Sequence, residues 1–222
     1  MTDGAGNGQI NGVDNTFNGI GQEPGDGDTA SGGQGPVNTT FGPAQIPCLT
    51  SMWDQTPYHV HAFVGIYYNG TQIALPDGVG MADPGMDDKN GFTYTVYGPK
   101  CYYQMHTHDA SGLVHVEVQP NNNFPQQTDT YYKLSDLLGL WGVGYSENSI
   151  GQYSGVIMAF TSGQFARGGP GTKGEIGSNT YTLYNGDWTQ IPLYSHEVIW
   201  IDIGSGNPTY ASLPNVAFWT EW

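Results

Sequence analysis

Two pairs of histidines, each separated by one residue, are the residues of this chain best suited to chemistry. They are His59 with His61, and His106 with His108. In a β-strand, residues i and i+2 project from the same face, so each pair would direct two imidazoles toward one point. Neutral imidazole binds zinc, copper, iron and nickel. The spacing therefore predicts a metal site built on strands.

A fifth histidine belongs to the same prediction. The residues from Asp109 to Gly112 have the composition of a tight turn and separate two β-like stretches. A hairpin with this turn would place His106 opposite His115, and cross-strand neighbours are about 5 Å apart at Cβ. Packing alone explains adjacent buried imidazoles poorly, because they need partners and repel one another when protonated. We expect one transition-metal ion, copper or zinc, with ligands from the set His59, His61, His106, His108 and His115.

Further polar residues lie beside these histidines in the sequence. Glu117 shares the face of His115 by i+2 spacing, so it could bind the metal, accept a hydrogen bond from a ligand histidine, or act as a general base. Asp109 is expected mainly to form the turn. His196, which precedes Glu197, could hydrogen-bond to a ligand of the metal without binding the metal itself. For each histidine taken alone, a hydrogen-bonded side chain near the core is the alternative.

Composition predicts an all-β fold. The chain has 222 residues with 34 Gly, 14 Pro and 15 Tyr, and it lacks long amphipathic helical patterns. This favours a single β-sandwich or barrel, jelly-roll or cupin-like, around one core. Asn69-Gly70 is a hairpin signal, and Asn185-Gly186 suggests a second, related hairpin. A helix is expected at 134–141, a long loop at 163–177, and strands at 59–68, 71–75, 92–96, 101–108, 113–118, 155–160, 180–184 and 197–203.

Residues 1–44 form a Gly/Asn/Asp-rich N-terminal extension ahead of a β-domain at 45–222. Such a segment cannot bury enough apolar surface to offset its own ordering entropy. Asp3, Asn7 and Asp14 fall at the offsets of a calcium-binding loop, which makes calcium a second candidate ion. A flexible linker and a segment that docks on another copy, giving self-association, are the alternatives.

The charge and the cysteine content limit the kinds of binding partner and the cellular location that we expect for the protein. Five Lys and Arg against twenty Asp and Glu give a net charge of -15, which argues against nucleic acid and anionic membranes. No apolar run approaches the roughly 20 residues of a membrane-spanning helix, so membrane insertion is not expected. Cys48 and Cys101 could form a disulfide, and with sequons at Asn38 and Asn69 they favour a secreted or cell-surface protein. The many large aromatics could support a carbohydrate contact, although core filling is their commoner use.

Three motifs within residues 46–204 carry a family resemblance. They are the strand His59-Val60-His61-Ala62, the hairpin from Cys101 to Glu117 containing His-Thr-His-Asp-x-Ser-Gly-x-x-His-x-Glu, and the stretch Ile191-Pro192-Leu193-Tyr194-Ser195-His196-Glu197. In these motifs the chain resembles a group of uncharacterised secreted bacterial proteins, which implies secretion but no assigned activity. A looser likeness to cupins rests on the two-histidine strand and implies only an architecture by analogy.

Three functions fit these observations. The first is an extracellular binding or structural protein that holds copper or zinc. The second is a copper-dependent oxidative enzyme acting on a polymer, with Glu117 as the candidate catalytic residue. The third is a self-assembling, filament-type subunit that uses its N-terminal segment. A closed site of four protein ligands favours the first, three ligands plus water in a cleft favour the second, and concentration-dependent assembly favours the third.

Overall fold

The computed structural model of the protein describes residues 9–11, 40–41, 44–45, 48–49, 58–73, 75, 79–82, 85–89, 92–97, 101–107, 112–118, 132–162, 180–194, 197–209 and 213–217. Within these residues the fold is all-β with one α-helix, as the composition predicts.

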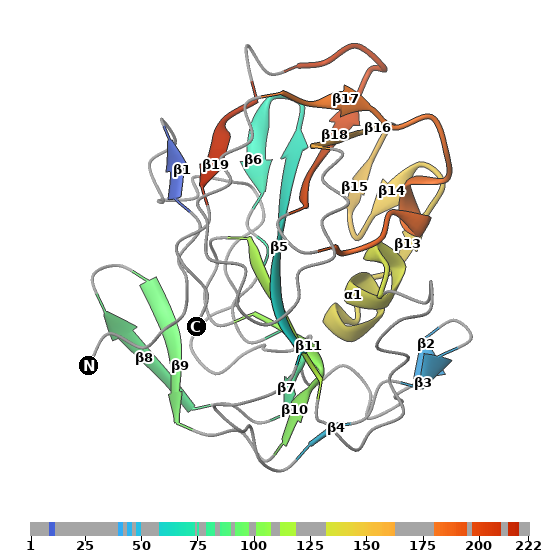
Figure 1. The fold of residues 1–222 in the computed structure, drawn as a ribbon. Coiled ribbons are helices and arrows are strands. Elements are labelled where there is room, and N and C mark those ends of the chain that lie inside the picture. Colours follow the sequence, from blue (N-terminus) through green and yellow to red (C-terminus); the bar gives the residue numbers. More distant parts are fainter. Residues whose placement is uncertain are drawn as a thin grey trace.

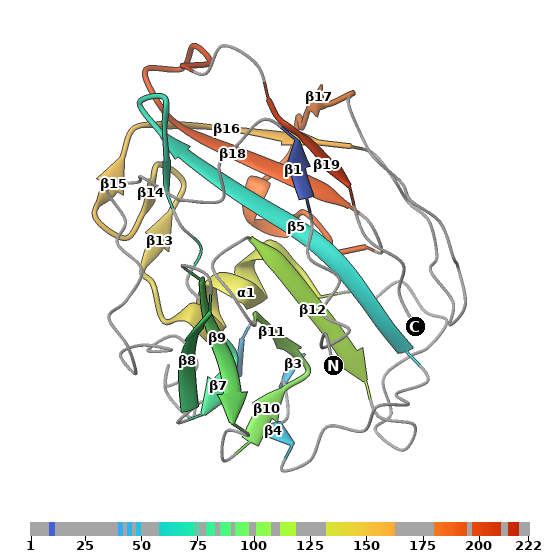
Figure 2. The ribbon, with the colours of Figure 1, turned by 90° about the vertical axis from the view of Figure 1, so that its left-hand side faces the viewer.

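A seven-stranded mixed sheet forms the centre of the fold. Its order is β11 (Met105–His106), β12 (Leu113–Val118), β5 (Tyr58–Tyr68), β18 (Val198–Gly204), β16 (Val156–Thr161) and β17 (Thr182–Leu183), with β6 (Thr71–Ile73) also paired to β5. Figure 2 shows the long strand β5 running between β12 and β18. The β5–β18 pair is parallel, whereas β12 and β6 are both antiparallel to β5.

Shorter elements surround this sheet. One three-stranded sheet contains β4 (Cys48–Leu49), β10 (Cys101–Tyr103) and β7 (Met81–Ala82), and another contains β13 (Tyr145–Ser146), β14 (Ser149–Ile150) and β15 (Tyr153–Ser154). Three strand pairs complete the described sheets: β1 (Gln9–Asn11) with β19 (Asn215–Ala217), β2 (Thr40–Phe41) with β3 (Ala44–Gln45), and β8 (Gly85–Lys89) with β9 (Phe92–Tyr97). The described helices are α1 (Leu134–Trp141) and the short 3-10 helix η1 (Trp188–Gln190).

In the middle of the central sheet both faces are buried, which explains why β18 and residues 62–67 of β5 are almost continuously apolar. On one face, the alternate residues of β5 from Ala62 to Ile66 pack with α1 in the main core. On the other face, Phe63 packs with Trp200 and with Val216 of β19 in a smaller cluster. Figure 1 shows α1 and β19 on opposite sides of β5. The fold is therefore layered around this one sheet.

Two glycines permit the close approaches that this layering needs. A Cβ on Gly65 would lie 2.1 Å from Cζ3 of Trp200, so only glycine admits the buried indole opposite it. At the end of β5, Asn69 and Gly70 both have left-handed backbones, with φ of 48° and 80°. Two such residues in succession are typical of a type I′ turn, so the hairpin predicted at Asn69-Gly70 is confirmed.

The structure corrects two of the local predictions. The strand predicted at 101–108 is divided at Gln104, where a bend takes the chain from the sheet of β10 into the central sheet of β11. Asn185-Gly186 does not form a second hairpin. It leads instead into η1, because the side chain of Asp187 accepts a hydrogen bond from the backbone N–H of Thr189 and caps that helix. The loop predicted at 163–177 lies outside the described residues.

Two described strands, β1 and β2, lie within the N-terminal extension, and β1 joins it to the C-terminal part of the chain. β1 pairs antiparallel with β19, and Ile10 stands opposite the fully buried Val216. The calcium residues Asp3, Asn7 and Asp14 lie outside the described residues. The domain division at residue 44 and self-association through residues 1–44 stay predictions.

Candidate metal centre

Three histidines stand in one row across three neighbouring strands of the central sheet. His106 of β11 is opposite His115 of β12, and His115 is in turn opposite His61 of β5. The pairing of His106 with His115, predicted from the turn between them, is thus confirmed. Glu117 follows two residues after His115 in β12 and stands opposite His59. Because alternate residues of a strand share a face, Glu117 projects on the same side as His115.

The side chains of His61, His106, His115 and Glu117, which we call the histidine row, lie close to one another. Nε2 of His61 lies 2.8 Å from Nδ1 of His115, and the same Nδ1 lies 3.9 Å from Oε1 of Glu117. The rings of His106 and His115 are stacked, with centroids 5.5 Å apart and an interplanar angle of 8°. One ligand atom from each of His106, His115 and Glu117 lies within 4.8 Å of the other two. This group could hold a metal ion.

His61 contacts this group through His115. At 2.8 Å the two nitrogens share a hydrogen bond when no ion is bound. Nitrogens bound to one tetrahedral zinc ion at its usual bond length are roughly 3.4 Å apart. To become a pair of ligands, His61 and His115 would therefore have to separate slightly and turn from each other toward the ion.

The orientation of His106 is set by the backbone. Nδ1 of His106 lies 3.0 Å from the carbonyl oxygen of Tyr103. Since a carbonyl only accepts hydrogen bonds, Nδ1 must carry the proton, and in the neutral ring Nε2 keeps the lone pair. A hydrogen bond from one ring nitrogen to a backbone carbonyl is the usual way in which proteins orient a histidine that binds metal through the other nitrogen.

The histidine row lies inside the protein. His61, His106, His115 and Glu117 are exposed by 1 %, 0 %, 3 % and 7 % of their surfaces. They share the sheet face of Phe63 and Leu113, which belong to the smaller apolar cluster. A carboxylate and three imidazoles in such a place have lost most of their hydration, so their interactions with one another and with an ion are strong.

A crossing segment at Val79 and Gly80 holds the short strand β11 in position. The backbone N–H of Thr107 donates to the carbonyl oxygen of Val79 at 2.9 Å, and the N–H of Val79 donates to Oγ1 of Thr107 at 3.0 Å. Gly80 lies so close that a Cβ there would be 2.1 Å from the carbonyl oxygen of Met105 and 3.0 Å from Cα of His106. The position of His106 thus depends on tertiary contacts as well as on pairing with β12.

The bend before β11 is fixed by hydrogen bonds to Gln104. Its carbonyl oxygen accepts from the backbone N–H of Glu117 at 2.7 Å, and its side-chain oxygen accepts from the hydroxyl of Tyr132. Burial raises the pKa of the Tyr132 phenol, and the negative charge of Asp136 raises it further. Tyr132 therefore stays protonated and remains a donor to Gln104.

Several residues named from the sequence lie outside this group. His108, Asp109 and His196 are outside the described residues. His59 belongs to β5 and stands opposite Glu117, but its side chain is outside the described part of the structure. Its role as a ligand, and the roles of the other three residues, stay predictions.

The two cysteines lie in neighbouring strands, Cys48 in β4 and Cys101 in β10. Cys48 stands opposite Tyr103, two residues from Cys101. Because both side chains are outside the described part of the structure, the disulfide between them stays a prediction.

The structure places Glu117 among the candidate metal ligands, a role that the sequence leaves open. The sequence leaves its role open between ligand, hydrogen-bond acceptor and base, whereas in the structure its carboxylate falls in the same ligand group as His106 and His115. The signal is present in the sequence, since His115 and Glu117 have the same i+2 spacing as the two His-x-His pairs.

Comparison of the chain with protein-family models, with curated proteins and with solved structures gives no match. The resemblance of residues 46–204 to secreted bacterial proteins therefore stays a prediction. None of the helices in the described residues has both the length and the apolar character needed to cross a membrane.

Proposed function

We propose that the protein binds one zinc or copper ion through His61, His106, His115 and Glu117 and acts as a binding or structural protein. The observation that carries this proposal is the buried group of His106, His115 and Glu117, whose ligand atoms lie within 4.8 Å of one another, with His61 of the neighbouring strand in contact with His115. The two cysteines and two sequons support placing this function outside the cell.

Packing alone accounts for this arrangement less well than a metal does. Burying polar groups is unfavourable unless each is well paired, and a buried carboxylate beside three imidazoles adds the desolvation of a charge. In the metal-free protein, His61 and His115 share the hydrogen bond between them, and His106 donates to the carbonyl of Tyr103. A bound cation would engage imidazole lone pairs and the charge of Glu117 at once.

The burial of the row favours a closed site over a catalytic one. His106, His115 and Glu117 supply three donors, and His61 would supply the fourth that a tetrahedral structural site requires. A catalytic site instead keeps one coordination position open to water or substrate, usually in a cleft. With each of the four side chains exposed by 7 % or less, a polymer substrate has no direct approach to the ion. This supports the binding function over the oxidative enzyme.

The proposal is tested by metal analysis of the purified protein. Metal-free protein is incubated with zinc or with copper(II), passed through a desalting column, and measured by inductively coupled plasma mass spectrometry. We expect about one equivalent of metal, with copper(II) giving the electron paramagnetic resonance signal of nitrogen ligands. Metal at about 100 times its dissociation constant should stabilise the fold by about 2.7 kcal/mol, which a thermal melt will detect.

Variants locate the site. His106→Ala and His115→Ala should each lose the bound metal, and Glu117→Gln, which keeps the shape of the side chain, should weaken binding at least about tenfold. Glu147→Gln makes the same change at an exposed carboxylate and is the matched control. If the wild-type protein takes up no metal, or if Glu117→Gln and His106→Ala bind it as tightly as the control does, the proposal is wrong.

A further inference from the structure

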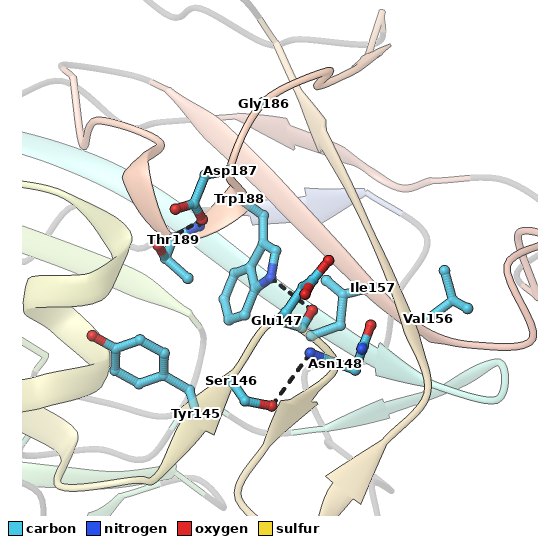
Figure 3. A pocket seen from close by; sticks show the side chains of 10 residues that line it. All are labelled: Tyr145, Ser146, Glu147, Asn148, Val156, Ile157, Gly186, Asp187, Trp188 and Thr189. Atoms are coloured by element: carbon cyan, nitrogen blue, oxygen red, sulfur yellow. Dashed lines mark hydrogen bonds between the residues drawn. The ribbon is translucent and has the colours of Figure 1, made fainter.

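A second candidate site lies on the surface, away from the histidine row. Figure 3 shows a groove between the β13–β14 turn, the start of β16 and the segment that leads into η1. Its volume is about 720 Å³, within the usual range for small-molecule sites. The lining residues are Tyr145, Ser146, Glu147, Asn148, Val156, Ile157, Gly186, Asp187, Trp188 and Thr189.

At the wall of this groove the exposed ring of Tyr145 packs against the buried ring of Trp188. Trp188 is buried, and its Nε1–H donates to the carbonyl oxygen of Glu147 at 3.3 Å. Tyr145 packs edge-on against this indole, with centroids 6.3 Å apart and an interplanar angle of 70°, yet 42 % of its surface is exposed. A ring held in this way gives a ligand apolar contact area at little cost in side-chain entropy. The exposed part of the Tyr145 ring is therefore available to a ligand in the groove.

The polar lining of the groove is rich in acceptors and carries no basic side chain among the residues that form it. The exposed carboxylates of Glu147 and Asp187 face it together with the amide of Asn148. Oδ1 of Asp187 already accepts from the N–H and the hydroxyl of Thr189, at 3.0 and 2.7 Å. A carboxylate has about four lone-pair sites on two oxygens, so Asp187 retains acceptor capacity. These groups suit a ligand with several hydroxyl donors and repel an anionic one.

We infer that the groove binds a neutral saccharide. A pyranose ring has one face of C–H bonds, which matches the exposed ring of Tyr145, and a rim of hydroxyls, which matches Glu147, Asp187 and Asn148. Acidic sugars and phosphorylated ligands are disfavoured by the two carboxylates. This site uses none of the histidine row, so the inference is independent of metal binding.

The inference is tested by isothermal titration calorimetry with cellohexaose, xylohexaose and mannohexaose, with and without added metal. We expect at least one of them to bind at the same affinity in both forms of the protein. Tyr145→Ala should weaken that binding by about tenfold or more, since it removes the stacking surface. Leu183→Ala is the matched control, because Leu183 is an exposed apolar residue on β17 outside the groove and should leave binding unchanged.

Three results would overturn the inference. They are no heat of binding with any of the three oligosaccharides, equal affinity in Tyr145→Ala and Leu183→Ala, or binding of a lysine-rich peptide in place of the sugars. The last result would show that the carboxylates select a cationic partner. Tyr145→Phe keeps the ring and should bind within a few-fold of wild type, which separates loss of the ring from misfolding.

Discussion

The central histidine of the row meets each of the other three side chains. Nδ1 of His115 lies beside both Nε2 of His61 and Oε1 of Glu117, and its ring stacks on that of His106. His115→Ala should therefore cost more metal affinity than His61→Ala, because it removes the contacts through which the row is aligned. Zinc dissociation constants measured by competition with a chelator check this. A larger loss in His61→Ala would show that alignment does not depend on His115.

Asp136 is a second buried polar residue whose behaviour can be derived from its surroundings. It lies in the first turn of α1 and accepts a hydrogen bond from the backbone N–H of Lys133 at 2.9 Å. Burial raises the pKa of its carboxyl, and the N–H and charge of Lys133 only partly oppose that effect. The folded protein thus holds a proton on Asp136 more tightly than the unfolded chain does.

This pKa shift predicts how Asp136→Asn changes the pH dependence of stability. Between the ordinary pKa of 3.8 and the higher folded pKa, the folded state binds more protons, so the contribution of Asp136 to stability falls as pH rises. The substituted amide does not titrate, and its oxygen can still accept from the N–H of Lys133. We expect urea unfolding to show the Asp136→Asn variant gaining stability relative to the wild type as pH rises across this window.

Asp187→Asn is the matched control for this experiment, because Asp187 also caps a helix but is exposed. It makes the same chemical substitution without the burial. If the wild-type protein instead gains stability relative to Asp136→Asn as pH rises, the pKa of Asp136 is not raised in the folded protein.

At the scale of elements, β11 shows how much a short strand depends on its neighbours. It has two residues, yet it carries His106, and the crossing segment at Gly80 is packed against it. Gly80 has a φ of +76°, in the left-handed region, and leaves no room for a Cβ. Gly80→Ala should destabilise the protein by about 2–4 kcal/mol, the sum of backbone strain and overpacking.

The same substitution should also reduce metal uptake, because β11 must shift to accommodate the new methyl group. Gly144→Ala is the matched control, since a Cβ there would have no atom within 4 Å. It should change the unfolding free energy by less than about 0.5 kcal/mol, as surface substitutions usually do. Chemical denaturation of the two variants checks this, and equal stabilities would show that β11 is not held by Gly80.

The elements that could be predicted from the sequence are those defined by local patterns. The sequence predicts β12 and α1 at the bounds that they have, and Asn69-Gly70 forms the expected turn. The pairing of His106 with His115 could be predicted because only a short turn separates them. The contact of His115 with His61 could not, because it joins residues 54 positions apart and depends on how β12 packs along β5. The parallel pairing of β5 with β18 is non-local for the same reason.

At the scale of the whole molecule, tyrosine burial and acidic charge both lower the stability of the fold at high pH. Burial raises the pKa of Tyr67, Tyr103, Tyr132 and Tyr181 above the ordinary value. In the unfolded chain these phenols ionise near their ordinary pKa of 10.0. The folded state then holds more protons than the unfolded state, so stability falls as pH rises past about 10.

The net charge of -15 adds repulsion between carboxylates, and salt separates the two effects. At about 1 M salt the screening length is about 3 Å, so repulsion across the surface is largely removed, whereas the cost of ionising a buried phenol remains. We therefore expect the urea concentration at the unfolding midpoint to decrease as the pH is raised from about 9 to about 11, even in high salt. Tyr67→Phe should reduce this fall, and Tyr145→Phe, at an exposed ring, should reduce it less. If high salt abolishes the fall, surface charge and not tyrosine burial limits the stability of the protein in alkali.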